Sequence, residues 1–312
     1  MEGQVVRHRA IEAAREAGEI FPIAELKKSL RRPRTLFSFL MSSLTALLTL
    51  AALVPLFSVV YMLLVRGGHA LSLSAFVSTP PAAFDEGGGF GNALVGTLAM
   101  VGIAALISVP LGILSAVFLA EVGSETKLAQ VVRFGGKVLS GFPSILAGVF
   151  AYGAVVLLTG GFSAVAGGVA LSLLMLPTVM LTAEDAIRMV PAKTREAAFG
   201  MGATRTQTIW HVVLPTALPG ILTGVMLAVA RAAGETAPLL FTAAFSNFWI
   251  VRFGHVALME RTASLAVLIY NFSGVPFENQ VDMAWAAALV MVLLVLAINL
   301  IGQTLSLRSH HE

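Results

Sequence analysis

The sequence contains no cysteine, and only 12% of its residues are charged. The absence of cysteine excludes disulfides, thiol catalysis and cysteine-ligated clusters. A soluble domain carries about 25% charged residues, so the low charge excludes an ordinary soluble globular protein. With 57% hydrophobic residues and a mean hydropathy of +0.87, the composition indicates a protein that crosses a membrane several times.

Sequence patterns of several other protein classes are also missing. The phosphate loop G-x-x-x-x-G-K-[ST] is absent, since RFGGKVLS lacks the first glycine, so the chain has no ATPase site of its own. The six histidines are scattered and predict no metal or haem site. Basic residues without interleaved aromatics argue against nucleic-acid binding. Residues 1–34 are long and carry both signs of charge, which indicates no cleavable secretory signal.

The apolar stretches predict an all-α membrane protein with six transmembrane helices. Several of them exceed the roughly 18 to 20 residues that cross a bilayer. The expected spans are 36–65, 92–120, 137–159, 162–183, 216–244 and 284–307. We expect a tail over 1–35, a transmembrane domain over 36–307 and a second tail over 308–312.

The basic residues predict the orientation of these spans. Only three of the 20 Lys and Arg residues, Arg66, Arg252 and Arg261, fall in the segments 66–91, 160–161 and 245–283. Cytoplasmic loops carry an excess of Lys and Arg. Both termini and the segments 121–136 and 184–215 are therefore expected on the cytoplasmic side.

Two further features concern the spans and the last external loop. Pro143 in SGFPSILAG is expected to bend the third span, and the small residues Gly141, Gly148, Gly153, Gly167 and Gly168 permit close helix contact. In the loop 245–283, the apolar part 263–272 is too short to span and is expected to be interfacial or re-entrant.

The segment from about 191 to 215 is polar and helix-prone, and an apolar run follows it directly. It contains the pattern E-A-A-x3-G-x9-hydrophobic-x-L-P, met by Glu196, Ala197, Ala198, Gly202, Val212, Leu214 and Pro215. Small alanines followed by glycine suit a helix-turn-helix that another protein's groove can grip, and Pro215 suits the first turn of the next helix. The alternative is an ordinary amphipathic loop helix. We expect a docking surface.

Two charges lie inside the apolar run that follows. Arg231 is 16 positions past Pro215, about 24 Å along a helix, and Glu235 follows at i+4 on the same face. Intramembrane charges usually face a cavity or the bundle interior, and a guanidinium can donate two parallel hydrogen bonds to an oxyanion. Arg231 and Glu235 are therefore candidates for an anion path. The alternative is a structural pair whose charges compensate each other.

Other polar residues are weaker candidates. Thr236 and Pro238 are expected to shape a helix break beside the pair, and Ser144 is a candidate hydroxyl for the same path. The alternative for each hydroxyl is a hydrogen bond to its own helix backbone. Glu184, Asp185 and Arg188 are expected to form a solvated helix end, with gating contacts as the alternative.

These motifs resemble a known family. The E-A-A pattern matches the EAA loop of binding-protein-dependent ABC transporter permeases, and ARAAGETAPLLFTA is similar to the signature of phosphate-specific permeases of the PstA type. LSGFPSI and GNALVGTL also resemble that family, so the likeness covers about 92–275. Residues 1–34 resemble nothing in it, and Leu181 stands where many members have a basic residue before T-x-E.

The resemblance implies a type I ABC importer permease fold with a cytoplasmic coupling helix, in a bacterial or archaeal inner membrane. It implies a phosphate importer in which this chain supplies half of the path. The implied partners are a second, PstC-type permease, two ATPase subunits that bind ATP and Mg²⁺, and an extracytoplasmic phosphate-binding protein. Without a basic residue at Leu181, the anion would rely on Arg231 and the partner subunit.

Two other functions stay open at this point. An ABC permease for another oxyanion, such as sulfate or molybdate, fits the same residues. An ion-coupled secondary transporter could use Glu235, but it would not need the coupling pattern.

Overall fold

The structure is a computed structural model that describes residues 33–85, 87–252 and 254–308. The chain divides into two compact units, Met1–Tyr61 and Met62–Glu312. The tail predicted over residues 1–35 lies outside the described residues as far as residue 32, and residues 309–312 of the second tail do too.

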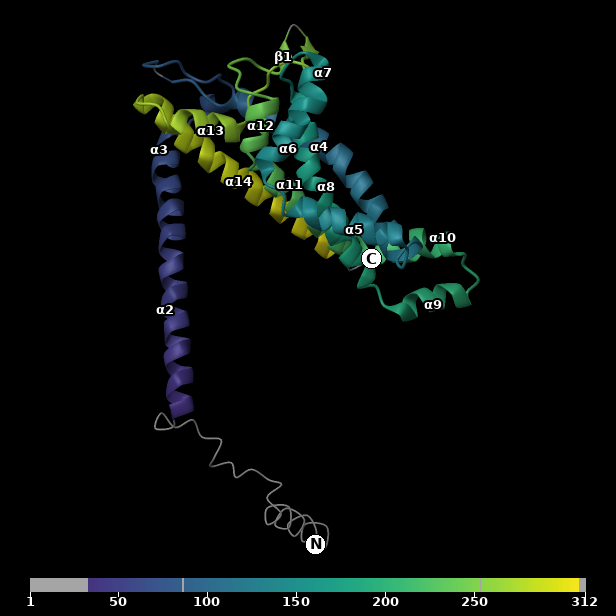
Figure 1. Ribbon diagram of the computed structural model, residues 1–312. Coiled ribbons are helices and arrows are strands. Elements are labelled where there is room, and N and C mark those ends of the chain that lie inside the picture. Colours follow the sequence, from purple (N-terminus) through teal and green to yellow (C-terminus); the bar gives the residue numbers. More distant parts are fainter. Residues whose placement is uncertain (1–32, 86, 253, 309–312) are drawn as a thin grey trace. The chain divides into compact units, whose positions relative to one another are not determined.

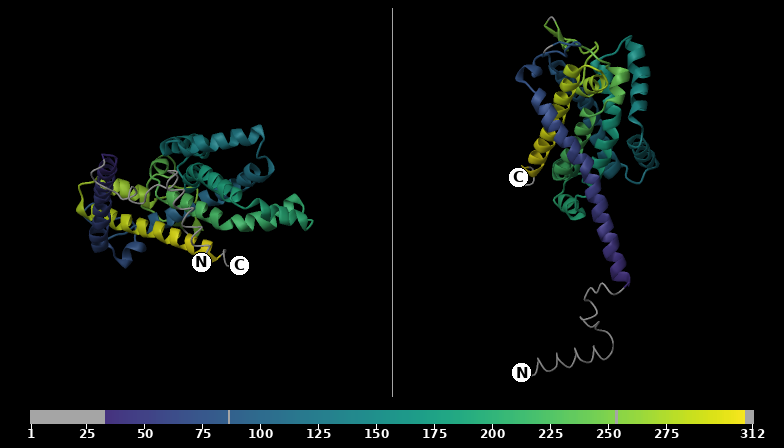
Figure 2. Two further views of the ribbon diagram at one scale, coloured as in Figure 1. Left: turned by 90° about the horizontal axis from the view of Figure 1, so that it is seen from below. Right: turned by 90° about the vertical axis from the view of Figure 1, so that its left-hand side faces the viewer.

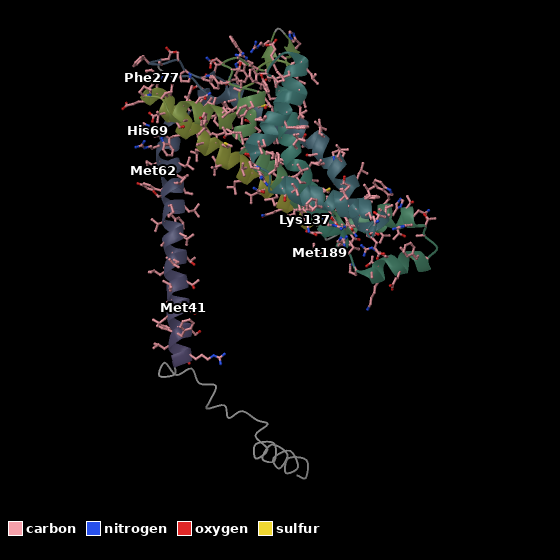
Figure 3. All side chains as sticks on the ribbon, viewed as in Figure 1. Met41, Met62, His69, Lys137, Met189 and Phe277 are labelled. Carbon is pink, nitrogen blue, oxygen red and sulfur yellow. The ribbon has the colours of Figure 1, made fainter. Side chains whose placement is uncertain are left out.

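Helix α2 (Pro33–Met62) carries almost the whole described part of the first unit. It belongs to a continuous apolar helix, Arg34–Ala70, with a mean hydropathy of 2.4 over its most apolar window. None of that window is buried, and side chains project from α2 on every side (Figure 3). Such a surface is stable only against lipid or another apolar partner.

The second unit is almost entirely helical (Figure 1). Its α-helices are α3 (Gly68–Ala70), α4 (Gly91–Val117), α5 (Lys127–Ser140), α6 (Ser144–Ala151), α7 (Leu157–Thr159), α8 (Ala164–Arg188), α9 (Ala192–Gly200), α10 (Arg205–Thr208), α11 (Leu214–Ala233), α12 (Ala237–Thr242), α13 (Leu265–Ser273) and α14 (Glu278–Arg308). The 3₁₀ turn is η3 (Leu73–Phe76), and the π-helical turns are η2 (Leu63–Gly67), η4 (Phe118–Val122), η5 (Tyr152–Val156) and η6 (Ile209–Val213). Strands β1 (Val251–Arg252) and β2 (His255–Val256) form one short antiparallel hairpin.

Five helices among the described residues are long and apolar enough to cross a membrane. They are Arg34–Ala70, Gly91–Val122, Ala164–Arg188, Arg205–Ala233 and Glu278–Thr304. A sixth candidate is the pair Lys127–Ser140 and Ser144–Thr159, bent by 106°. The prediction of a helical membrane protein with about six spans is confirmed.

The third expected span, 137–159, differs from the prediction. Pro143 does not bend one helix: α5 ends at Ser140, and Pro143 adopts extended backbone with ψ 128° just before α6. Because Pro lacks an N–H and disfavours helical backbone in the residue before it, a helix usually ends at this place. The apolar part of the expected span is therefore Ser144–Thr159, which follows the break.

The fifth expected span, 216–244, is also not one helix. The helix begins earlier, at Arg205, and runs to Ala233. Gly234 caps its end, and α12 starts again at Ala237 with Pro238 in its first turn. The helix break expected at Thr236 and Pro238 is confirmed.

The core centres on α8, which packs against both α4 and α11. Glycines bring these helices close: a methyl group added at Gly168 would lie 2.5 Å from Cγ2 of Ile103, and one at Gly112 would lie 2.7 Å from Cγ1 of Val179. The expected close contacts hold at Gly148, Gly167 and Gly168, whereas nothing lies within 4 Å of a methyl group at Gly153. Small residues therefore fix the helix spacing where α8 is buried.

The bundle of the second unit has two ends (Figures 1 and 2). The β1–β2 hairpin and α7 lie at one end, and α9 and α10 lie at the other. Figure 3 places Lys137 and Met189 at the α9 end, and His69 and Phe277 at the hairpin end. The segments expected on opposite sides of the membrane thus occupy opposite ends. Helix α13 is largely buried and, at nine residues, is too short to span.

Candidate functional site

Arg231 and Glu235 form an ion pair at the end of α11. Nε of Arg231 lies 3.5 Å from Oε1 of Glu235, and the side chains are 44% and 18% exposed. Because α11 ends at Ala233, Glu235 follows the helix rather than lying on the same helical face, as the sequence had suggested. The long distance leaves the guanidinium weakly held and open on the surface of the chain. An arginine on an apolar helix needs water, an anion or a protein partner opposite it.

Helices α6 and α12 run side by side in the same direction. A methyl group added at Gly148 would lie 2.7 Å from Cα of Pro238, and farther along, the N–H of Ser163 donates to the carbonyl of Thr242 at 2.9 Å. Ser144 lies one turn before Gly148, and Thr236 lies two residues before Pro238. The starts of both helices, and both hydroxyls, therefore occupy a similar level of the bundle.

Ser144 and Thr236 are both partly exposed. Neither hydroxyl has a hydrogen-bond partner within the part of the chain that the structure describes. The alternative reading, in which each hydroxyl bonds to its own helix backbone, is thus not what the structure has. Their place on an anion path stays a prediction.

The segment 191–215 forms the expected helix-turn-helix. Helix α9 contains Glu196, Ala197 and Ala198, and the turn after it passes through Gly202 with φ +87°, a conformation that favours glycine. Thr204 then starts α10 with a capping box to Gln207. Ala198 is buried, whereas Glu196 and Ala197 are exposed, so α9 turns one face outward.

Pro215 lies where it was predicted, but the helix before it was not predicted to be continuous with α11. It lies in the first turn of α11, but the helix is continuous from Arg205, and the π-turn Ile209–Val213 precedes it directly. A π-turn is a common way to insert an irregularity into a helix. Leu214 and Pro215 therefore join the coupling segment to α11 without a break.

Glu121 anchors this segment to the bundle. Arg195 of α9 donates to Oε1 of Glu121 at 2.7 Å and to the carbonyl oxygen of Ile187 at 2.9 Å. Arg205 of α10 donates to the backbone carbonyl of Glu121. Neither Glu121 nor the role of Arg195 was predicted from the sequence, although Arg195 directly precedes the E-A-A pattern.

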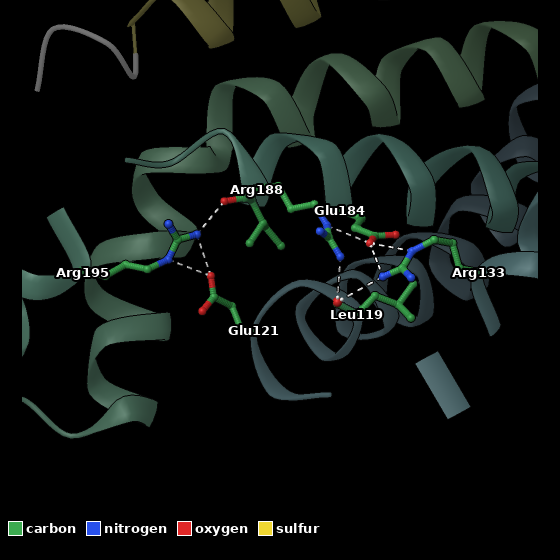
Figure 4. A network of polar contacts seen from close by, with 7 residues as sticks. Leu119, Glu121, Arg133, Glu184, Arg188 and Arg195 are labelled. Atoms are coloured by element: carbon green, nitrogen blue, oxygen red, sulfur yellow. Dashed lines mark hydrogen bonds and ion pairs between the residues drawn. The ribbon is translucent and has the colours of Figure 1, made fainter. Parts of the chain in front are cut away.

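Glu184 is the centre of a second group of charges at the same end (Figure 4). Its Oε1 accepts from Arg133 at 2.7 Å and from Arg188 at 2.9 Å. Both guanidiniums also donate to the carbonyl of Leu119 at 3.4 Å. The prediction of a solvated helix end is wrong for Glu184, which is only 3% exposed, because Arg133 reaches it from α5. Asp185 and Arg188 are exposed, as expected.

The hairpin end carries a separate cavity of about 820 Å³, lined by Tyr152, Val156, Leu157, Gly160, Gly161, Phe162, Phe245, Ser246, Asn247, Phe248, Arg252, Glu260 and Arg261. Arg252 pairs with Glu260 at 2.7 Å, and the Arg261 guanidinium lies 5.4 Å from the centroid of the Phe162 ring. The buried Asn92 holds one wall by donating to the carbonyls of Ser246 and Phe248.

Known proteins share this sequence and this fold. The family of binding-protein-dependent transport system inner membrane components matches residues 108–309. The phosphate transport system permease protein PstA of Yersinia pestis is 37% identical over 286 residues, which cover 91% of this chain and 94% of that protein. PstA of Haemophilus influenzae is 40% identical over 244 residues, covering 78% and 84%.

The fold is also that of a solved transporter. A chain from the bacterial alginate ABC transporter, crystallised with an alginate-bound periplasmic protein, superposes with a TM-score of 0.62. The match covers 90% of this chain and 98% of the other, at 17% identity. The helices of this chain are therefore arranged as in that transporter chain.

Proposed function

From the premise that this chain belongs to the binding-protein-dependent inner membrane components, and among them to the PstA permeases, we propose that it forms one half of the path by which inorganic phosphate crosses the membrane. It is the permease subunit of an ABC importer and not its ATPase. The observation that supports the substrate is Arg231, an open guanidinium with only a 3.5 Å contact to Glu235. A planar fork of N–H donors suits a phosphate better than a neutral solute.

The surroundings of Arg231 suit an anion that carries a proton. Glu235 is close enough to neutralise Arg231 when no anion is bound, and its carboxylate can accept a hydrogen bond from a protonated phosphate oxygen. Ser144 and Thr236 add two hydroxyls at the level of the nearby helix breaks, and neither has a partner among the residues that the structure describes. Sulfate at neutral pH has no proton to donate, so this set favours phosphate.

The rest of the path comes from a second permease. Arg231 is 44% exposed on the otherwise apolar helix α11, and facing lipid would cost several kcal/mol. A PstC-type partner opposite α11 would enclose it. An extracytoplasmic phosphate-binding protein would deliver the anion at the hairpin end.

Energy comes from two ATPase subunits that hold ATP and Mg²⁺. They would grip α9 at the exposed Glu196 and Ala197 and the turn at Gly202, on the cytoplasmic side together with both termini. ATP binding would move α9, and the continuous helix Arg205–Ala233 would carry that motion to Arg231. The path would then open alternately to the two sides.

The test is ATP-driven uptake of labelled phosphate into proteoliposomes that contain the whole complex and its binding protein. We expect uptake to resist excess sulfate, and to fall at least tenfold in Arg231→Lys, which keeps the charge but loses the fork. Arg66→Lys, an exchange of an exposed arginine in η2, is the matched control and should leave uptake unchanged. Uptake that sulfate abolishes, or that ignores Arg231→Lys in an assembled complex, would reject this assignment.

A further inference from the structure

A second cavity lies between α5 and α8, at the end of the bundle that carries α9. Its volume is about 540 Å³, and it is lined by Arg133, Lys137, Leu181, Glu184, Asp185 and Arg188. The two helices pack closely beside it, since a methyl group added at Gly136 would collide with Cε of Met180. The cavity is separate from Arg231 and Glu235, neither of which lines it.

The two arginines of this cavity are held in fixed positions. Glu184 accepts from Arg133 through both Nε and Nη2, at 2.9 and 2.7 Å, and from Nε of Arg188 at 2.9 Å. Nη2 of each arginine also reaches the Leu119 carbonyl. A buried carboxylate therefore orients two guanidiniums before any ligand arrives, which lowers the entropic cost of binding.

Donors remain free after these contacts. Within the described residues, no acceptor is bound to Nη1 of Arg133, to Nη1 of Arg188 or to the amino group of Lys137. Lys137 lies one turn after Arg133 on α5, so both reach the same space. With Glu184 and Asp185 counted, the lining carries a net charge of +1. Such a set of donors is made for an oxyanion.

We propose that this cavity binds a phosphate group, as a second site after Arg231 on the way to the ATPase side; this rests on the proposed function. Lys137 provides the point charge and the two arginines provide N–H donors. The exposed Asp185 accepts from the proton of a monobasic phosphate, which sulfate lacks. The same chemistry also fits the phosphate of an anionic lipid headgroup, and the experiment separates the two sources.

Binding here is connected to the coupling segment. The arginines that face the cavity also hold the Leu119 carbonyl, and Glu121, two residues later, holds Arg195 of α9. A phosphate that draws Arg188 or Arg133 toward the cavity would weaken this attachment. Phosphate that accumulates on the ATPase side therefore binds in this cavity and slows further import.

The experiment measures initial uptake of labelled phosphate into phosphatidylcholine proteoliposomes preloaded with ATP and increasing unlabelled phosphate. We expect luminal phosphate to inhibit the wild-type complex more strongly than luminal sulfate does. In Lys137→Gln the half-inhibiting concentration should rise about tenfold, equivalent to about 1.4 kcal/mol of binding, when the inhibition of each complex is expressed relative to its own uptake into a lumen without added phosphate. Lys137→Arg should restore inhibition. Lys127→Gln, on the same helix but outside the cavity, should match the wild type.

The outcomes separate the possibilities. Equal inhibition of Lys137→Gln and wild type, or no inhibition of the wild type, overturns the free-phosphate site. If adding phosphatidylglycerol instead changes wild-type uptake but not that of Lys137→Gln, the bound group belongs to a lipid. No uptake by the wild type into an empty lumen would sink the proposed function. Binding of radiolabelled inorganic phosphate to the solubilised complex, wild type against Lys137→Gln, would then decide the cavity by itself.

Discussion

Arg195 donates through Nε and Nη2 to Oε1 of Glu121, at 3.0 and 2.7 Å, across 74 positions of sequence. The pair is mostly buried, with the side chains 21% and 13% exposed. It is the ionic attachment between α9 and the end of the helix that starts as α4. Because this attachment lies between the exposed face of α9 and the bundle, we expect a movement of α9 to reach the membrane-spanning helices through it.

Arg195→Gln should uncouple ATP hydrolysis from transport. The variant leaves the Glu121 carboxylate without its cation, which costs about 1–3 kcal/mol locally, and α9 loses its fixed position. We expect phosphate uptake to drop about tenfold while the purified complex still hydrolyses ATP. Parallel assays of ATPase and uptake on the same proteoliposomes measure this. Glu125→Gln changes an exposed carboxylate of the same loop and should behave as wild type. A proportional loss of both activities would contradict the uncoupling.

Glu184→Gln should destabilise the permease, and Asp185→Asn should not. Removing the Glu184 charge leaves Arg133 and Arg188 close together without their shared anion, and a partly buried unpaired charge costs roughly 1–3 kcal/mol or more. Thermal unfolding of the detergent-purified complex, followed by loss of the monodisperse species, measures the difference. Asp185 is the exposed neighbour, and its carboxylate has no hydrogen bond to the described residues. Equal melting temperatures for the two variants would mean that Glu184 is not a structural centre.

Gly168→Ala should weaken the contact of α8 with α4. The added methyl group would lie 2.5 Å from Cγ2 and 2.7 Å from Cβ of Ile103, and overpacking typically costs about 1–3 kcal/mol. Gly153→Ala is the matched control, because nothing lies within 4 Å of its methyl group and alanine is the better helix former. We expect a lower melting temperature for the first variant and an equal or higher one for the second. The reverse order would show that α8 tolerates a wider spacing.

Asn92→Ala should loosen the wall of the cavity at the hairpin end. Nδ2 of Asn92 donates to the carbonyls of Ser246 and Phe248, at 2.9 and 3.4 Å. Losing these bonds costs about 1–3 kcal/mol and frees the segment 245–252. Hydrogen exchange of peptides from this segment should speed up. In Asn299→Ala only a local helix bond to the Val295 carbonyl is lost, so exchange near Ser246 should stay unchanged. Unaltered exchange in Asn92→Ala would exclude the anchoring role.

The sequence predicted the helical membrane fold, the number of candidate spans and the two-sided distribution of basic residues, because each depends on local composition. It also predicted the helix-turn-helix of residues 191–215 and the break near Thr236, because Gly202 and Pro238 are local signals for a turn and a helix break. The full break at Pro143 was underestimated, since a lone proline is compatible with both a bend and a new helix.

Contacts between distant segments could not be predicted in this way. Glu184 lies at the end of an apolar span, where the sequence predicts a solvated side chain. It is buried because Arg133, 51 positions away, pairs with it. The same holds for Glu121 and Arg195. The sequence shows which residues are charged but not which of them contact each other, so the network in Figure 4 is seen only in the structure.

Glu121 also connects both short helices of the segment 191–215 to the bundle. Its carboxylate accepts from Arg195 of α9, and its carbonyl accepts from Arg205 of α10, so both short helices are attached to the same residue. From Arg205 the helix continues without a break to Ala233, which places Arg231 about 39 Å along the rod. If this helix tilted by about 5° about its Arg205 end, Arg231 would move sideways by about 3 Å. That is the length of one hydrogen bond, so a tilt of this size would be enough to separate Arg231 from a group that it binds on a neighbouring surface.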